Sequence, residues 1–307
     1  MNIVVASGKG GTGKSMLASS LSLLFSQNWR IVACDCDVDA PNLGLWLGVT
    51  TYDSVEQIST SEKARIDPEK CIGCGKCYEN CFFGAIEKTD SKFKVNSLLC
   101  EGCGVCKLLC PAEAIELTPV MNGEIRVKKT KWGFPLVSGR LKPGETGSGK
   151  IVQELRRRAE KINHEIMILD AAAGIGCPVI ASVMGCDYAV LVTEPTPSAI
   201  SDLQRILKIV NHFNIPYGII LNKWDINPRA SEEITRWSGE RFLGRISYDR
   251  EVVNSIVNLT PVILSESKVK DEIKEVFNRI CESASLYHVN EAPSKSFLFN
   301  QKSRISQ

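Results

Sequence analysis

The segment from Ser7 to Ser15, S-G-K-G-G-T-G-K-S, constrains the fold of this chain more than any other stretch. It follows the apolar run 3–6, which predicts a short buried strand, and it precedes residues 16–25, whose apolar spacing predicts a helix. The segment fits G-x-x-x-x-G-K-S, in which glycines let backbone N–H groups close around phosphate oxygens. In this pattern Lys14 reaches the outer phosphates and the Ser15 hydroxyl binds Mg²⁺. Strand, loop and helix together predict a nucleotide-binding loop.

A second lysine, Lys9, stands early in this loop, where a simple phosphate-binding loop does not need one. The pattern K-G-G-T-G-K-S resembles the deviant Walker A loop of the superfamily that includes MinD, ParA, Mrp and the nitrogenase iron protein. In that superfamily the early lysine crosses a dimer interface and contacts the nucleotide of the other subunit. The resemblance implies catalytic roles for Lys9 and Lys14 in a homodimer, or in a heterodimer with a related ATPase. It implies nucleotide contacts by Gly8, Lys9, Gly10, Gly11, Thr12, Gly13, Lys14, Ser15 and Met16. The alternative is that Lys9 is only a solvated loop charge.

Length and charge narrow the class of protein. A chain of 307 residues is long enough for one large α/β domain and a small one. A net charge of +2 gives no reason to expect nucleic acid or an anionic membrane as the main partner. No apolar run approaches the ~18 residues of a membrane span. We therefore expect a cytoplasmic location and no membrane binding.

Eight of the thirteen cysteines fall in two runs with the same spacing, C-x2-C-x2-C-x3-C. The runs are Cys71, Cys74, Cys77 and Cys81, and then Cys100, Cys103, Cys106 and Cys110. Metal ligation explains such clusters better than a disulfide framework, because the chain shows no secretion signal. Two runs of this kind are typical of a bacterial-type ferredoxin with two [4Fe–4S] clusters, in which the fourth cysteine of each run ligates the other cluster.

This exchange predicts the ligand sets of both clusters. One set is Cys71, Cys74, Cys77 and Cys110, and the other is Cys81, Cys100, Cys103 and Cys106. Phe82 follows the first run where Pro111 follows the second, a departure from the ferredoxin pattern that leaves the ligands intact. Structural zinc is the alternative, but it leaves the third and fourth cysteines of each run unexplained. Few large apolar side chains lie here, so the clusters are expected to supply much of the core.

Acidic residues follow two of the expected strands. Asp37 is the second acid of a D-x-D segment after strand 30–34, where the related ATPases have a first switch whose second Asp orients the attacking water and lies at the Mg²⁺ site; Asp35 and Asp39 are the weaker candidates. Asp170 ends the apolar strand 165–170, a Walker B arrangement in which the Asp orients a water on Mg²⁺. Magnesium is therefore expected at Ser15, Asp37 and Asp170.

Further along, Asn222 begins N-K-W-D, which by itself resembles the guanine-binding motif of GTPases. In the MinD-like relatives an Asn at this place binds adenine, so ATP is the expected nucleotide and GTP the alternative. Cys177 lies seven residues after Asp170, as a cluster-binding cysteine does in nitrogenase iron proteins. A buried thiol is the preferred interpretation, since no second cysteine stands near Gly147. Asn122-Gly123 predicts a tight β-hairpin.

The resemblance implies an α/β fold: a doubly wound, mostly parallel P-loop NTPase sheet with an inserted bacterial-type ferredoxin (α+β) domain. The expected organisation is ATPase over 1–63, ferredoxin insert over 64–118, ATPase over 119–287 and a polar tail over 288–307.

Three functions agree with these features. The preferred one is an ATP-binding and ATP-hydrolysing dimer that couples its nucleotide state to electron transfer through two [4Fe–4S] clusters towards a redox partner. The second is an Mrp-like iron–sulfur assembly or carrier ATPase with an acceptor protein as partner. The third is a MinD-like positioning protein whose clusters sense redox state.

Overall fold

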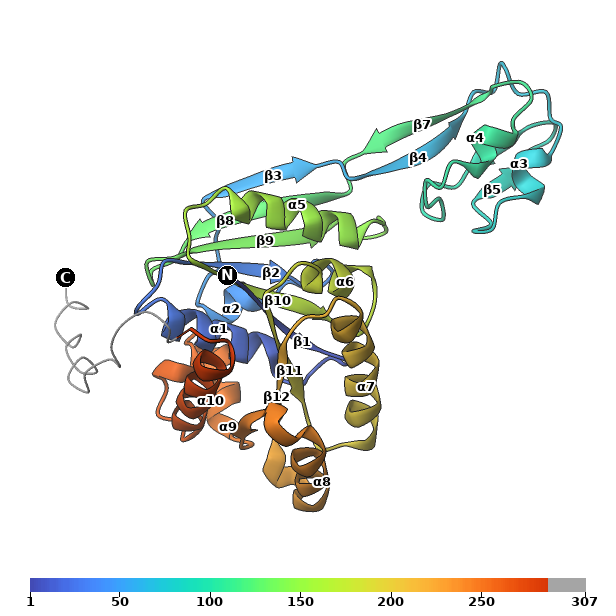
Figure 1. The fold of residues 1–307 in the computed structure, drawn as a ribbon. Coiled ribbons are helices and arrows are strands. Elements are labelled where there is room, and N and C mark those ends of the chain that lie inside the picture. Colours follow the sequence, from blue (N-terminus) through green and yellow to red (C-terminus); the bar gives the residue numbers. More distant parts are fainter. Residues whose placement is uncertain (287–307) are drawn as a thin grey trace.

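The computed structural model describes residues 1–286, so the predicted polar tail, 288–307, lies outside the described residues. Figure 1 shows a large α/β body and a small lobe that stands away from it at the end of a two-stranded ribbon. The body contains both the N-terminal and the C-terminal parts of the described chain.

A single nine-stranded sheet forms the centre of the body, in the order β13-β12-β11-β1-β10-β2-β9-β8-β3. The strands from β13 to β9 in this order are parallel, and β8 and β3 extend the sheet with antiparallel pairing. This confirms the mostly parallel α/β fold predicted from the sequence. The strands are β1 (Asn2–Ser7), β2 (Ile31–Cys36), β3 (Ser54–Ile58), β8 (Gly123–Lys129), β9 (Pro135–Leu141), β10 (Ile166–Ala173), β11 (Tyr188–Thr193), β12 (Tyr217–Asn222) and β13 (Phe242–Ile246).

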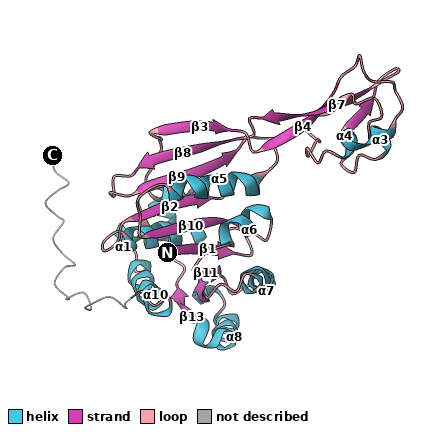
Figure 2. Cartoon of the chain, turned by 45° about the horizontal axis from the view of Figure 1, so that its top comes forward, coloured by secondary structure: helices cyan, strands magenta, loops and turns pink. Residues whose placement is uncertain are grey.

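Helices cover both faces of this sheet (Figure 2). Alternate residues of each strand point to opposite faces, so each face contributes to its own apolar core. One face packs against α1 (Lys14–Phe25), α2 (Leu43–Trp46), α9 (Arg250–Val257) and α10 (Val269–Ser283). The other packs against α5 (Ser148–Glu160), α6 (Cys177–Val183) and α7 (Pro197–His212), while α8 (Pro228–Ser238) follows β12. Three 3-10 turns, Trp224–Ile226, Gly239–Arg241 and Val262–Leu264, complete the body.

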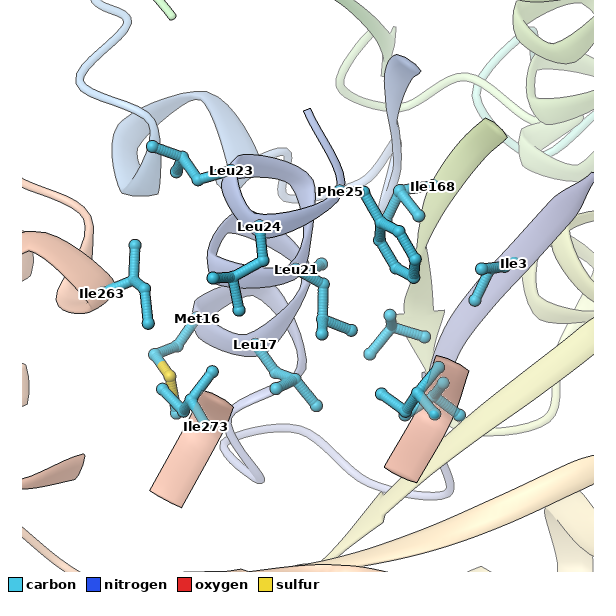
Figure 3. Close-up of a cluster of buried hydrophobic side chains, with 14 of the residues drawn as sticks. Ile3, Met16, Leu17, Leu21, Leu23, Leu24, Phe25, Ile168, Ile263 and Ile273 are labelled. Atoms are coloured by element: carbon cyan, nitrogen blue, oxygen red, sulfur yellow. The ribbon is translucent and has the colours of Figure 1, made fainter. Parts of the chain in front are cut away.

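The core around α1 fixes the end of the nucleotide-binding loop. Figure 3 shows Leu17, Leu21 and Phe25 of α1 gathered against the sheet residues Ile3 and Ile168. These side chains are fully or almost fully buried, and each contributes roughly 1.5–3 kcal/mol of transfer free energy. Because α1 starts at Lys14, the position of the loop follows from the packing of the helix.

Met16, expected among the nucleotide contacts, turns its side chain into this same core, where it is 3% exposed (Figure 3). Any contact of Met16 with a nucleotide would therefore be made by its backbone.

The lobe is held by the antiparallel ribbon of β4 (Ser61–Ile66) and β7 (Ile115–Val120). It contains the short hairpin of β5 (Ile86–Lys88) and β6 (Phe93–Val95) and two short helices, α3 (Lys76–Glu79) and α4 (Val105–Leu109). The expected limits of the insert, 64 and 118, both fall within the ribbon. The core of the lobe is small and includes Cys77 and Cys100 beside Phe93.

The hairpin predicted at Asn122-Gly123 is wrong. The strands on its two sides do not pair with each other, because β7 pairs with β4 while β8 pairs with β3 and β9. The Asn122 side chain is hydrogen-bonded to Thr60 on the neighbouring strand connection instead of closing a tight turn. The chain passes here from the ribbon into the sheet, and strand β9, which no prediction covered, takes the place of a hairpin partner.

Candidate functional site

The predicted phosphate-binding loop connects the end of β1 to the start of α1 at the centre of the sheet. Gly11 and Gly13 have φ angles of 78° and 94°, in the left-handed region that favours glycine. A Cβ atom at Gly13 would lie 2.3 Å from Asn222 Nδ2, so a side chain here would displace Asn222 from the loop as well as strain the backbone. Lys14 is buried at the N-terminus of α1, where helix dipole and lysine charge both favour an anion.

The start of the loop is wedged between α7 and β10. A Cβ atom at Gly8 would lie 2.1 Å from the carbonyl oxygen of Asp202 on α7. On the other side, a Cβ atom at Gly10 would lie 3.9 Å from Cβ of Ala173 at the end of β10. The loop therefore contacts the end of β10 and helix α7, which follows β11; β10 and β11 are the two strands that flank β1.

Asp170 lies on β10, next to the loop, and is completely buried. Neither of its carboxylate oxygens has a hydrogen-bond partner within residues 1–286. Burial raises the pKa of Asp170 to about 7, while the Lys14 charge and the Ser15 hydroxyl oppose the rise and Asp37 adds to it. A buried carboxylate with free oxygens beside a hydroxyl is a donor set that suits Mg²⁺.

Two acids of β2 and its following turn lie beside Asp170. Asp35 is its cross-strand partner, is fully buried, and accepts a hydrogen bond from the Leu43 N–H at 3.1 Å. Burial, followed by the charges of Asp170 and Asp37, raises the pKa of Asp35 well above its usual range. Asp37 is only partly buried, and burial raises its pKa against the opposing charge of Lys14. Asp37 is therefore the more accessible acid for contact with a water.

Lys9 contacts its own chain. Its Nζ lies 2.7 Å from Glu194 Oε1 and 3.3 Å from Ser198 Oγ. Lys223 holds the other oxygen of Glu194 at 3.2 Å and donates to the carbonyl of Gly11 at 2.9 Å. Burial raises the pKa of Glu194, but its contacts with the two lysines outweigh burial and lower it overall. Sequence reasoning missed Glu194, and the signal that could have found it is an acid directly after a buried parallel strand.

Asn222 also lies against the loop. Its Nδ2 donates to the carbonyl of Thr12 at 2.7 Å, and its Oδ1 accepts from the Lys223 N–H at 3.0 Å. Asp225, the last residue of N-K-W-D, accepts from the Tyr248 N–H at 2.7 Å and so links two loops at this edge. In the single chain, the Asn222 side chain, predicted to bind the base, is therefore hydrogen-bonded to the phosphate-binding loop.

Two cavities in the lobe are lined by the eight clustered cysteines. One is lined by Cys71, Cys74, Cys77 and Cys110, and the other by Cys81, Cys100, Cys103 and Cys106. The structure thus brings together the same two sets of four that the ferredoxin spacing predicts. The rest of each lining is largely apolar, with Phe93 and Ile115 at the first cavity and Ile86 and Val95 at the second.

The repeat in sequence is also a repeat in backbone geometry. The N–H of Ala85 donates to Cys81 Sγ at 3.3 Å, and the N–H of Ala114 donates to Cys110 Sγ at 3.3 Å. Hydrogen bonds of this kind stabilise a cysteine sulfur as a cluster ligand and tune the cluster potential. Left-handed glycines occupy matching places in the two runs: Gly73 and Gly75, then Gly102 and Gly104. Among residues 1–286, no three or more His, Cys, Asp or Glu side chains are grouped so that they could hold a single metal ion.

Cys177 is exposed, so its prediction as a buried thiol is wrong. It is the first residue of α6, which begins shortly after the carboxyl end of β10, the strand of Asp170. The first turn of this helix is open to solvent at Cys177. The other four cysteines outside the two runs, Cys34, Cys36, Cys186 and Cys281, are buried in the body. Among the helices of residues 1–286, none has both the length and the apolar character needed to cross a bilayer.

With this fold and loop geometry, the chain belongs to the family of the CobQ/CobB/MinD/ParA nucleotide binding domain, which it matches over residues 3–262. It is 39% identical to the uncharacterized protein MJ0578 of Methanocaldococcus jannaschii, with 92% of this chain and 97% of that protein covered. It is 25% identical to the iron-sulfur cluster carrier protein of the same organism, with 91% and 83% covered. The septum site-determining protein MinD complexed with Mg-ADP from Pyrococcus horikoshii OT3 has the same fold, with a TM-score of 0.57, 18% identity, and 93% and 97% covered.

Proposed function

We propose that this protein binds and hydrolyses ATP as a dimer and couples its nucleotide state to electron transfer through two [4Fe–4S] clusters. The observation that carries the proposal is the grouping of eight cysteines around two cavities in the same chain as a phosphate-binding loop. The proposed ferredoxin domain spans residues 64–118, within the lobe and its ribbon.

On the nucleotide side, the chain offers a complete set of polar groups. The loop amides and Lys14 would bind the phosphates, and Ser15 and Asp170 would hold Mg²⁺. Asp37, the partly exposed acid, would accept a hydrogen bond from the attacking water and orient it. ATP is the proposed nucleotide, and Asn222 would have to leave the Thr12 carbonyl to reach a base.

In a dimer, Lys9 would leave Glu194 and complete the phosphate site of the partner subunit. Its ion pair with Glu194 is local and leaves the Lys9 side chain 30% exposed, so an incoming phosphate can compete for it. Hydrolysis would return Lys9 to Glu194.

In the lobe, each set of four cysteines would hold one cluster, which supplies reversible one-electron chemistry when bound. The chain positions the eight sulfurs, surrounds them with a largely apolar lining that limits contact with water, and donates backbone N–H groups to Cys81 and Cys110. Because the ribbon carries these cavities away from the body, the clusters would serve a partner protein that docks on the lobe (Figure 1).

The test is anaerobic purification followed by iron analysis, spectroscopy and turnover measurement. We expect about eight irons per chain and reducible clusters. Added Mg–ATP should change the electron paramagnetic resonance spectrum of the reduced protein. Lys14→Ala should lower ATP turnover about 100-fold and remove the spectral response without loss of iron. Lys208→Ala, at an exposed site on α7, is the matched control and should leave turnover and response unchanged. Full iron content without ATP binding would disprove the proposal.

A carrier function is the second candidate, favoured by the exposure of Cys74 and Cys103, one in each set. Exposed ligands are the ones an acceptor protein reaches first. Incubation with an apo-ferredoxin separates the candidates: cluster transfer within minutes supports the carrier, and clusters that cycle redox state without leaving support electron transfer.

A further inference from the structure

Asn122 is a buried polar residue that neither proposed site uses, and it lies where the ribbon joins the body. Its Oδ1 accepts from the Thr60 N–H at 2.8 Å, across the two strand connections. Its Nδ2 donates to the Thr146 carbonyl at 2.8 Å, and its own carbonyl accepts from the Lys142 N–H at 2.9 Å. One side chain therefore ties both strands of the ribbon to the loop 142–147.

That loop makes two further contacts with the lobe and ribbon. Glu145 forms an ion pair with Lys63 of β4, with Nζ and Oε2 2.8 Å apart, and Lys63 is only 5% exposed. A Cβ atom at Gly144 would lie 3.1 Å from Cδ2 of Leu98, a residue of the lobe between the two cysteine runs. Glu145 is partly exposed, but loss of its carboxylate would leave the buried Lys63 charge without its partner, so the pair favours contact between the ribbon and the loop.

The loop leads without a break into α5, and α5 holds both ends of α6. Gly147 caps α5 with φ 95°, and a Cβ atom there would lie 3.2 Å from Asn122 Nδ2. A Cβ atom at Gly149 would lie 3.1 Å from Cβ of Cys177, the first residue of α6. At the other end of α6, the buried guanidinium of Arg156 donates to the carbonyl of Ala181 at 2.7 Å.

Helix α6 in turn follows the segment that carries Asp170. β10 ends at Ala173, Gly174 has φ 93°, and α6 begins at Cys177. A shift of this short segment on Mg²⁺ and nucleotide binding would reach α6 directly. The packed pair α5–α6 would carry that shift to the loop 142–147 and so to the ribbon.

We infer that Asn122, with the Lys63–Glu145 pair, forms a joint that couples the nucleotide site to the orientation of the lobe through α6 and α5. This inference rests on the proposed function and names its connecting residues. They are positioning residues, because none touches the nucleotide loop or lines a cysteine cavity. Chains of packed side chains and hydrogen bonds can carry coupling of this kind, and the contacts described here run from the segment after Asp170 to Asn122 at the end of the ribbon.

Hydrogen exchange on the anaerobic holoprotein tests the joint, with and without Mg²⁺ and a non-hydrolysable ATP analogue. In the wild type, the analogue should change exchange of the ribbon amides 115–120 by about fivefold or more, together with those of α6. In Asn122→Ala the α6 response should remain and the ribbon response should be lost. Lys94→Met, which removes an exposed lobe pair with Glu87 at 3.1 Å, is the control and should respond as the wild type does.

A charge reversal distinguishes loss of the joint from misfolding of the variant. Lys63→Glu should abolish the ribbon response, and adding Glu145→Lys should restore it. A ribbon that responds equally in Asn122→Ala, or that fails to respond in the wild type while α6 does, would overturn the joint and leave the proposed function standing. If the analogue protects neither residues 7–15 nor α6, or if iron is absent from the same sample, the proposed function itself fails.

Discussion

Replacing Glu194 tests most directly whether Lys9 contacts the phosphates of a partner subunit. Its carboxylate holds Lys9 at 2.7 Å in the single chain, so it competes with any phosphate of a partner subunit. Glu194→Gln should tighten the Mg–ATP dimer about threefold, the equivalent of an ion pair worth roughly 0.7 kcal/mol. Sedimentation at several concentrations measures the dimer constant. Glu233→Gln, from an exposed pair with Arg229 on α8, should change nothing, and an equal shift in both variants would contradict the competition.

Asp170 predicts how stability depends on pH when Mg²⁺ is absent. Its pKa is raised from the usual 3.8 to about 7, so between these values the folded state keeps a proton that the unfolded state has lost. Stability must therefore fall as pH rises through this window, by at most about 1.4 kcal/mol per pH unit for this proton, and Asp35 acts in the same direction. Urea unfolding at pH 5 and pH 8 measures the difference. Asp170→Asn should flatten the slope, and a stability that rises with pH would contradict the assignment.

At the scale of the element, Arg156 holds the C-terminal end of α6. Its buried guanidinium donates to the carbonyl groups of Ala181 and Met184, which end a helix of only seven residues. Arg156→Met should lower the free energy of unfolding by about 2–3 kcal/mol, because carbonyl groups lose charged donors in a buried place. Arg157→Met, one residue away and paired with Glu154 at the surface, should cost less than about 1 kcal/mol. Equal losses would show that α6 does not depend on this contact.

The elements also show what the sequence can and cannot predict. The strand, glycine-rich loop and helix of the nucleotide-binding loop follow from local patterns, because they adjoin in sequence, whereas the neighbours of β1 in the sheet, β10 and β11, lie far along the chain. The grouping of the cysteines around two cavities agrees with the spacing rule for ferredoxins. Asn122 shows the limit: the local turn pattern is the same in a hairpin and in a strand that changes sheets, and only the distant partners β3, β4 and β9 decide between them. Glu194 and the loop contact of Asn222 likewise depend on residues far along the chain.

At the scale of the whole molecule, the body and the lobe have separate cores. The lobe core is small and includes Cys77 and Cys100, whereas the body has two extensive apolar cores. Removing the proposed clusters with an oxidant and a chelator should unfold the lobe and leave the body able to bind ATP. Limited proteolysis should then cut within residues 67–114 while calorimetry still detects nucleotide binding. Loss of ATP binding together with the clusters would contradict this independence.

The ribbon that carries the lobe has six cross-strand pairs, from Ser61 opposite Val120 to Ile66 opposite Ile115. Successive side chains of a strand alternate in direction and advance by about 3.4 Å. Deleting one residue from each strand would therefore present the opposite side of the lobe to the body, while deleting two would keep its facing and shorten its reach by about 7 Å. Chains of this architecture can thus differ in how far the cysteine-bearing end extends only in steps of two residues per strand, if the same side is to meet the same partner.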